Sequence, residues 1–261
     1  MNKVIEIKNL NFAYTPNKKF EDFCLELYEG DIVSLIGPAG SGKTTLLKIL
    51  CHKLPNESVY YENINIKSCS LELLKENIVV VFNHPFNTKN LKEELAYYLK
   101  KLNRDTDEIN LKINKYIEIF KLQNIVHIEL NKLDYNNQTL IKILRYLIIE
   151  PKFIAIDSLF SGLKEKDKKI IADIIIDRDM TLLNVIYNLE DTLYGNKICV
   201  LDDFTTILEG NTLSILKTDT IIKRLGFKLP LAVNLSIELN HYEVIKKIYA
   251  DKERLIKELW R

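Results

Sequence analysis

A glycine-rich segment of eight residues constrains this chain more than any other feature. It reads Gly37-Pro38-Ala39-Gly40-Ser41-Gly42-Lys43-Thr44 and fits the pattern G-x-x-x-x-G-K-[ST] at every required position. A continuous apolar run at 31–36 precedes it, and the residues TTLLKILCHKL after it have helical spacing. The segment therefore lies between a buried strand and the start of a helix, which is the context that the pattern requires.

This loop predicts a binding site for the phosphates of ATP. Its glycines let backbone N–H groups surround the β-phosphate, and the helix amino terminus adds partial positive charge. Lys43 is expected to reach the β and γ oxygens, and Thr44 to supply a hydroxyl for Mg²⁺. The alternative, a glycine-rich turn with an incidental lysine, does not explain the strand and helix around it. The predicted nucleotide-binding residues are Gly37, Pro38, Ala39, Gly40, Ser41, Gly42, Lys43, Thr44 and Thr45.

A second apolar run supplies the acidic residue that such a site needs. Residues 153–157 read FIAID, so that Asp157 closes a predicted buried strand. An aspartate in this place holds Mg²⁺ together with the hydroxyl of the phosphate loop. We therefore predict Thr44 and Asp157 as metal-binding residues, with a simple capping role for Asp157 as the alternative.

Further apolar runs predict the rest of a parallel sheet. They lie at residues 77–82, 153–156, 182–186 and 197–201. The first three are apolar enough to lie inside a sheet that helices cover on both faces. Residues 4–10 and 23–28 instead alternate apolar and polar side chains, which predicts an antiparallel pair of strands at the start of the chain.

Helical periodicity dominates two other parts of the chain. It fills residues 91–150, and it returns near the end, including a charged amphipathic tail at 242–261. We expect an α/β fold: a P-loop NTPase with a RecA-like parallel core, an antiparallel β-subdomain, an inserted helical subdomain and a C-terminal helical extension. The expected ATP-binding domain spans 1–217, with its helical subdomain at about 88–150, and the extension spans 218–261.

Composition limits the possible partners and the location. The net charge is +1, so the chain as a whole does not attract nucleic acid or anionic lipid, and we expect no nucleic-acid partner. The four cysteines form no C-x-x-C pair, which argues against a zinc site. No signal peptide and no run of about 18 apolar residues is visible, so we expect a cytosolic chain that serves a membrane only as a peripheral subunit.

The order of these segments resembles the ATP-binding cassette transporter family, and within it the energy-coupling factor type, over nearly the whole chain. PKFIAID at 151–157 matches the acidic strand of the family, and VFNHPFNT at 81–88 resembles its glutamine loop. MTLLNVIYNLED at 180–191 resembles its switch strand. LGFKLPLAVNLSIEL at 225–239 resembles the carboxy-terminal helices of energy-coupling subunits.

The resemblance implies partners as well as an additional contact with ATP. Tyr14 matches the aromatic residue that stacks on adenine in this family, although a core or strand-edge tyrosine is the alternative reading. The implied partners are a second ATP-binding subunit, a transmembrane coupling subunit and a substrate-binding membrane subunit. Such an assembly sits at the cytoplasmic side of the cell membrane and drives uptake of a vitamin or a metal ion.

The catalytic positions that the family implies are altered here. Ser158 replaces the glutamate that activates water, Tyr187 followed by Asn188 replaces the switch histidine and its aspartate, and Asn83 replaces the loop glutamine. Asn83 remains a candidate metal ligand beside Thr44. A positioned general base contributes about 10²–10⁴ in rate, so we expect no intact catalytic set and little hydrolysis. ATP binding does not depend on these positions.

The signature segment of the family is also altered. Asp134 stands where the family has a serine, Tyr135 and Asn136 replace two glycines, and Lys164 replaces an acid in the following loop. A carboxylate that faces the partner's triphosphate adds like-charge repulsion, which favours a heterodimer with a more complete cassette. Alternatively, this segment is misaligned with the signature of the family by a residue or two. Two alternative functions stay open: a soluble ATP-binding scaffold or regulator, and a slow ATPase with an unrecognised base.

Overall fold

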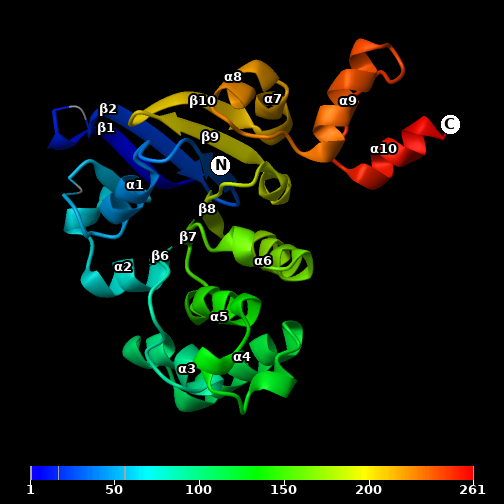
Figure 1. Ribbon diagram of the computed structural model, residues 1–261. Coiled ribbons are helices and arrows are strands. Elements are labelled where there is room, and N and C mark those ends of the chain that lie inside the picture. Colours follow the sequence, from blue (N-terminus) through cyan, green and yellow to red (C-terminus); the bar gives the residue numbers. More distant parts are fainter. Residues whose placement is uncertain (1, 17, 56, 261) are drawn as a thin grey trace.

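The computed structural model describes residues 2–16, 18–55 and 57–260, and a six-stranded sheet forms the centre of these residues (Figure 1). The order across the sheet is β10-β9-β3-β8-β7-β6, and all neighbours are parallel except β10 and β9. The strands are β3 (Ile32–Ile36), β6 (Ile78–Val81), β7 (Phe153–Asp157), β8 (Thr181–Val185), β9 (Lys197–Asp202) and β10 (Thr205–Asn211). The four apolar runs that predicted a parallel sheet are therefore β6, β7, β8 and β9, and β3 and β10 complete it.

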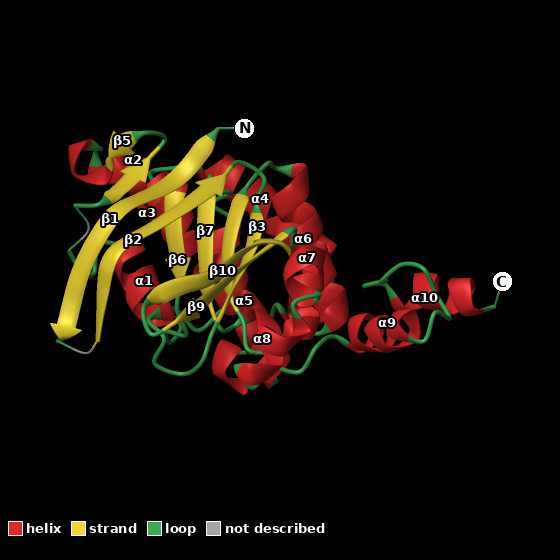
Figure 2. Ribbon diagram, turned by 90° about the horizontal axis from the view of Figure 1, so that it is seen from above, coloured by secondary structure: helices red, strands yellow, loops and turns green. Residues whose placement is uncertain are grey.

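A smaller antiparallel sheet lies beside this central sheet, as Figure 2 shows. Its order is β2-β1-β4-β5. The strands are β1 (Lys3–Thr15), β2 (Lys18–Tyr28), β4 (Val59–Tyr61) and β5 (Ile64–Asn65). The predicted antiparallel pair at 4–10 and 23–28 is thus correct, and both strands are longer than the alternating pattern indicated.

Helices cover both faces of the central sheet. Alternate residues of each strand point to opposite sides, and in the buried strands the side chains on both sides are apolar and must be covered. On β7, Phe153 and Ala155 pack toward the antiparallel sheet and α1 (Lys43–Leu50), whereas Ile154 and Ile156 pack toward the opposite helical layer. Every residue of β3 and β8 is buried, as expected for central parallel strands. Helix α2 (Leu71–Asn77) leads into β6 at the edge of the sheet.

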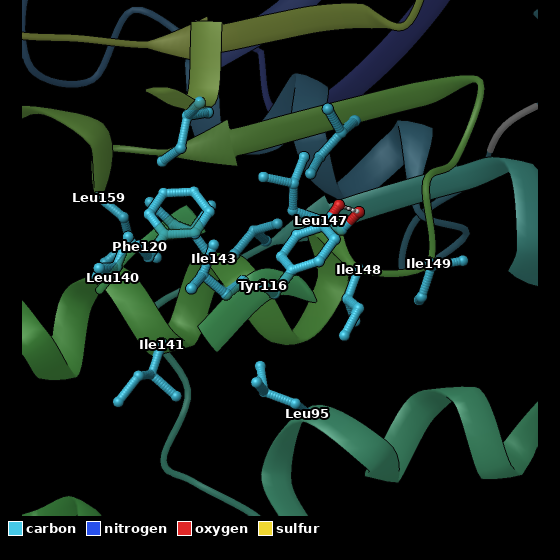
Figure 3. Close-up of a cluster of buried hydrophobic side chains, with 14 of the residues drawn as sticks. Leu95, Tyr116, Phe120, Leu140, Ile141, Ile143, Leu147, Ile148, Ile149 and Leu159 are labelled. Carbon is cyan, nitrogen blue, oxygen red and sulfur yellow. Dashed lines mark hydrogen bonds between the residues drawn. The ribbon is translucent and has the colours of Figure 1, made fainter. Parts of the chain in front are cut away.

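The opposite layer contains the helical part of the chain. Its helices are α3 (Leu91–Lys101), α4 (Thr106–Ile119) and α5 (Tyr135–Leu147), with α6 (Glu165–Asp177) following β7. Figure 3 shows their shared core, in which Leu95, Tyr116 and Ile143 lie close together. The hydroxyl of Tyr116 donates to the backbone oxygen of Leu147 over 3.1 Å, so that a polar group in this core is paired.

The C-terminal region is helical but more interrupted than the sequence predicted. It contains α7 (Thr212–Leu216), α8 (Asp219–Arg224), α9 (Leu231–His241) and α10 (Lys252–Leu259), and Figures 1 and 2 show α9 and α10 standing away from the rest. The expectation of a continuous helical tail from residue 242 was wrong. Glu243 takes a left-handed φ of 59°, and the Asn240 side-chain amide donates to the backbone oxygen of Ile245 over 2.9 Å, which closes a turn there. The helix restarts only where Asp251 caps α10.

Short 3₁₀ helices complete the connections: η1 (Ile66–Ser68), η2 (Gln123–Ile125), η3 (Leu130–Lys132), η4 (Phe160–Gly162) and η5 (Leu189–Tyr194). Within the described ranges, no helix combines the length and the apolar character needed to cross a membrane. The domain boundary at residue 217 and the helical subdomain at about 88–150 stay predictions.

Candidate nucleotide-binding site

The glycine-rich loop connects β3 to α1, and its surroundings require glycine at two positions. A Cβ on Gly37 would lie 1.9 Å from the backbone oxygen of Leu201, at the end of the neighbouring strand β9. Gly42 has a φ of 104°, and a Cβ there would lie 2.9 Å from the ring of Phe204 and 3.0 Å from that of Phe20. These glycines therefore let the backbone pack against the sheet, in addition to any approach of a phosphate.

Lys43 opens α1 and folds back over the loop. Its Nζ donates to the backbone oxygens of Gly37 and Pro38, over 2.8 and 2.7 Å, and to Ser41 Oγ over 3.1 Å. The side chain is buried. Burial lowers the pKa of the Lys43 ammonium, and the nearby carboxylate of Asp157 acts in the opposite direction. The cation is thus held at the centre of the loop by acceptors that belong to the loop itself.

The two predicted metal-binding residues are neighbours in space. Thr44 Oγ1 donates to Asp157 Oδ2 over 3.3 Å, across 113 positions of sequence. A hydroxyl and a carboxylate at this separation are oxygen donors of the kind that hydrated Mg²⁺ takes in phosphate sites. The donor set therefore fits the metal that the motif implies.

Ser158 lies directly beside this pair. Its Oγ donates to Asp157 Oδ1 over 3.0 Å, and its backbone N–H donates to the oxygen of Val185. The residue has a φ of 63°, which is uncommon for a residue other than glycine. The chain turns sharply after β7, and the serine hydroxyl is bound to the metal-site carboxylate.

Asn83 follows the end of β6 on the same edge of the sheet. Its Oδ1 accepts a hydrogen bond of 2.7 Å from the ammonium of Lys142 on α5. The same Nζ lies 5.5 Å from the ring centre of Phe86. The predicted glutamine-loop residue is therefore bound to the helical layer.

A buried ion pair fixes the rest of this segment to the helical layer. Arg145 Nη1 donates to Glu94 Oε1 over 2.8 Å and to the backbone oxygen of Pro85 over 2.9 Å, and both charged side chains are almost fully buried. Glu94 Oε2 accepts from the backbone N–H groups of Asn87 and Thr88, over 2.8 Å each. The sequence patterns did not predict roles for Lys142, Glu94 and Arg145. Their signal was weak, since single charges within amphipathic helices are ordinary.

The two predicted aromatic residues of the site are partly exposed. Tyr187 follows β8, is 55% exposed, and its ring centre lies 5.5 Å from Lys43 Nζ. Tyr14 lies near the end of β1, is 50% exposed and contacts the edge of Phe12. Tyr14 is therefore not a core residue.

The segment at the signature position begins α5. Asp134 caps the helix, because its Oδ1 accepts from the backbone N–H of Asn137 over 2.7 Å. Asn136 Oδ1 accepts from the backbone N–H of Lys164 over 2.6 Å, so that this helix start is joined to the loop before α6. Tyr135 is 70% exposed. The carboxylate of Asp134 thus occupies the helix amino terminus that the backbone offers to an anion.

Comparison with known proteins settles the family. A sequence model described as ABC transporter matches residues 20–161, which is more than half of the chain. This chain belongs to the ABC transporter family. The energy-coupling factor transporter ATP-binding protein EcfA1 of Mycoplasmopsis synoviae is 24% identical over 262 residues, covering 96% of this chain and 97% of that protein.

Solved structures agree with the ABC assignment at the level of fold. The cbiO1 protein of Clostridium perfringens, described as part of the transporter complex cbiONQ, has a TM-score of 0.74 at 18% identity and covers 94% of this chain and 100% of that one. A dimeric ATP-binding cassette bound to ADP and Pi has a TM-score of 0.69 at 22% identity, covering 80% of this chain and 98% of that one. The predicted resemblance to energy-coupling ABC subunits and the predicted P-loop α/β fold with its antiparallel β-subdomain are confirmed.

Proposed function

We propose that this chain is the ATP-binding subunit of an energy-coupling factor importer, and that it binds Mg-ATP while hydrolysing little of it. The likeness to EcfA1 over nearly its full length supports the first part. The single observation that carries the second is Ser158, whose hydroxyl is bound to Asp157 at the position where the family has its catalytic glutamate.

Binding requires only groups that the loop already presents. Backbone N–H groups of the loop and the start of α1 surround the phosphates. Lys43 releases the backbone oxygens of Gly37 and Pro38 and donates to phosphate oxygens instead. Thr44 and Asp157 would hold Mg²⁺, which would supply positive charge to offset that of the phosphates. Tyr14 and Thr45 complete the nucleotide contacts.

Hydrolysis lacks its usual groups at the same site. A serine hydroxyl is not a general base near neutral pH, and Asp157 is committed to the metal. Asn83 is shorter than glutamine and is bound to Lys142. Tyr187 lacks the imidazole of the switch residue. These replacements together explain why we expect binding without appreciable turnover.

The start of α5 supports a heterodimer. In a cassette dimer this segment faces the nucleotide of the opposite subunit, and one of the matched structures is such a dimer bound to ADP and Pi. Asp134 directs a carboxylate to that position, so two copies of this chain would weaken both sites. We infer that the second subunit is a more complete cassette that carries most of the hydrolysis.

A groove beside the edge strand β6 supports docking on a membrane subunit. It has a volume of about 480 Å³, and it is lined by apolar residues of the sheet edge together with residues of α2, α3 and α5, such as Lys75, Val80, Tyr98 and Tyr146. Because both the core and the helical layer form its walls, a shift between them changes its shape. We place a cytosolic segment of the transmembrane coupling subunit there, with a separate membrane subunit selecting the vitamin or metal ion at the cytoplasmic membrane.

Co-expression tests this proposal. The tagged chain is expressed with any cassette and membrane genes that lie beside its own gene, and detergent-purified complexes are analysed. Recovery of a complex that contains both a second cassette and a membrane subunit is the expected result. Recovery with soluble proteins alone would contradict it and would favour the ATP-binding scaffold.

A further inference from the structure

Lys142 brings a positive charge from the helical layer to the edge of the sheet where ATP is expected to bind. Its Nζ donates to Asn83 Oδ1 over 2.7 Å and faces the ring of Phe86. In the part of the chain that the structure describes, no carboxylate forms an ion pair with it. The ammonium therefore has a neutral partner only, although it stands next to a site for a polyanion.

The pairing of two strands brings Asn83, and with it this ammonium, to the edge of the sheet that carries the expected metal site. Val81 on β6 pairs with Ile156 on β7, so the residues that follow each strand leave the sheet at the same edge. Asn83 therefore lies on the same edge as Asp157 and Ser158. Asp157 accepts a hydrogen bond from Thr44, and these two residues mark the place where the metal is expected beside the outer phosphates. We therefore expect the γ-phosphate, which ADP lacks, to lie on the side of the loop toward these residues.

Buried contacts of the same helix fix the position of Lys142. Arg145, one helical turn further along α5, is bound to Glu94 and to the backbone of the segment that carries Asn83. Both members of that ion pair are buried, so α5 and the segment move together. The Lys142 side chain is itself half-buried, one helical turn from the buried Arg145. Incomplete hydration of this kind strengthens the interaction of an ammonium with an anion.

We propose that Lys142 distinguishes ATP from ADP by exchanging its hydrogen bond to Asn83 for one to the terminal phosphate. The inference rests on the proposed function, because it requires that the nucleotide binds at Gly37–Thr44. ATP then draws α5 toward the core through a contact that ADP cannot make. The start of the same helix carries Asp134 on the face expected to meet the second cassette, so the contact links the third phosphate to dimer closure.

The test compares affinities for ATP and ADP by isothermal titration calorimetry in excess Mg²⁺. Lys142→Met is expected to weaken ATP binding about 10- to 100-fold, the range for loss of one charge-assisted hydrogen bond, and to change ADP affinity less than about 2-fold. Lys142→Gln removes the charge but keeps a donor for Asn83, and it is expected to lose the preference for ATP as well. Lys132→Met, at a solvent-exposed lysine of the same layer, is the matched control.

A second variant separates direct contact from mere positioning of Asn83. If Lys142 acts on the phosphate, adding Lys142→Met to Asn83→Ala lowers the affinity for ATP further, whereas the affinity for ADP changes less than about 2-fold. If Lys142 only positions Asn83, the single and double variants behave alike, which would overturn the proposal. Equal weakening of ATP and ADP, or no change in either, would also overturn it. Failure of the unaltered chain to bind either nucleotide would instead contradict the proposed function.

Discussion

The two sides of the nucleotide site differ in what their polar side chains contact. On the core side, the loop at Gly37–Thr44 keeps each residue of its motif, and Lys43 rests on oxygens that it can exchange for those of a phosphate. On the side formed by the strand ends and α5, the polar side chains are bound to one another: Asn83 to Lys142, and Ser158 to Asp157. We propose that phosphate binding relies mainly on the first side and hydrolysis on the second, so that ATP binding can persist where hydrolysis is lost.

The largest expected effect concerns the attachment of the Asn83 segment to the helical layer. Glu94→Gln leaves Arg145 as an uncompensated buried charge and turns an amide toward the N–H groups of Asn87 and Thr88. We expect the free energy of unfolding to fall by about 3–5 kcal/mol. Chemical denaturation measures this change. Glu93→Gln, one position earlier and exposed, is the control, and equal effects of the two variants would show that the buried pair does not stabilise the helical side.

The core side is tested most strongly at Lys43. Lys43→Ala removes the one side-chain ammonium that rests on the loop oxygens, so ATP affinity is expected to fall at least about 100-fold. Fluorescence titration with a labelled ATP analogue measures this loss. Lys48→Ala, on the same helix, should bind normally. An unchanged affinity of Lys43→Ala would mean that the nucleotide binds elsewhere.

Loop packing is tested by a pair of glycine substitutions. Gly42→Ala meets the rings of Phe204 and Phe20 and also requires a φ of 104°, whereas Gly30→Ala requires a φ of 77° in open space. We expect Gly30→Ala to lower the free energy of unfolding by about 1–2 kcal/mol, from backbone strain alone. We expect Gly42→Ala to lower it further, because the added methyl group also meets the two rings. Thermal unfolding compares the two. If both variants lose the same stability, close packing of the loop against the β9–β10 turn does not matter.

The smallest expected effect lies at the start of α5. Asp134→Ala removes a helix cap and is expected to lower the free energy of unfolding by about 0.5–2 kcal/mol. Asp134→Ser keeps a capping oxygen, so its stability should stay within a few tenths of a kcal/mol of that of the unaltered chain. Denaturation curves of both variants measure the difference. Asp134→Ser therefore restores the residue of the family with little change in stability. With a complete cassette as partner, it should raise ATP hydrolysis in the partner's site, and no change there would contradict the assigned orientation of this helix.

The features that could be predicted from the sequence are those formed by residues close together along the chain. The loop at Gly37–Thr44 and the strand ending at Asp157 are local patterns, and pairing of parallel strands brings their ends together. Lys142 with Asn83, and Arg145 with Glu94, are 59 and 51 positions apart. Their contacts depend on how α3 and α5 pack on the sheet edge, which no periodicity specifies.

The C-terminal tail shows the opposite error, in which periodicity predicted too much. Charged and apolar residues after Tyr242 alternate with helical spacing, yet the turn at Glu243 ends α9, and α10 begins only at Lys252. A side-chain hydrogen bond from Asn240 satisfies a backbone oxygen in that turn. Such a bond between a side chain and the backbone competes with the helix, and the hydrophobic pattern does not reveal it.

We propose that this chain binds ATP but does not turn it over appreciably. The most direct test measures Mg-ATP binding and steady-state ATP hydrolysis in the same preparation, with Lys43→Ala in parallel. We predict saturable binding that Lys43→Ala removes, with the bound nucleotide recovered as ATP. Repeated turnover at about 1 s⁻¹ or faster, within the ordinary range of enzymes and abolished by Lys43→Ala, would contradict the account.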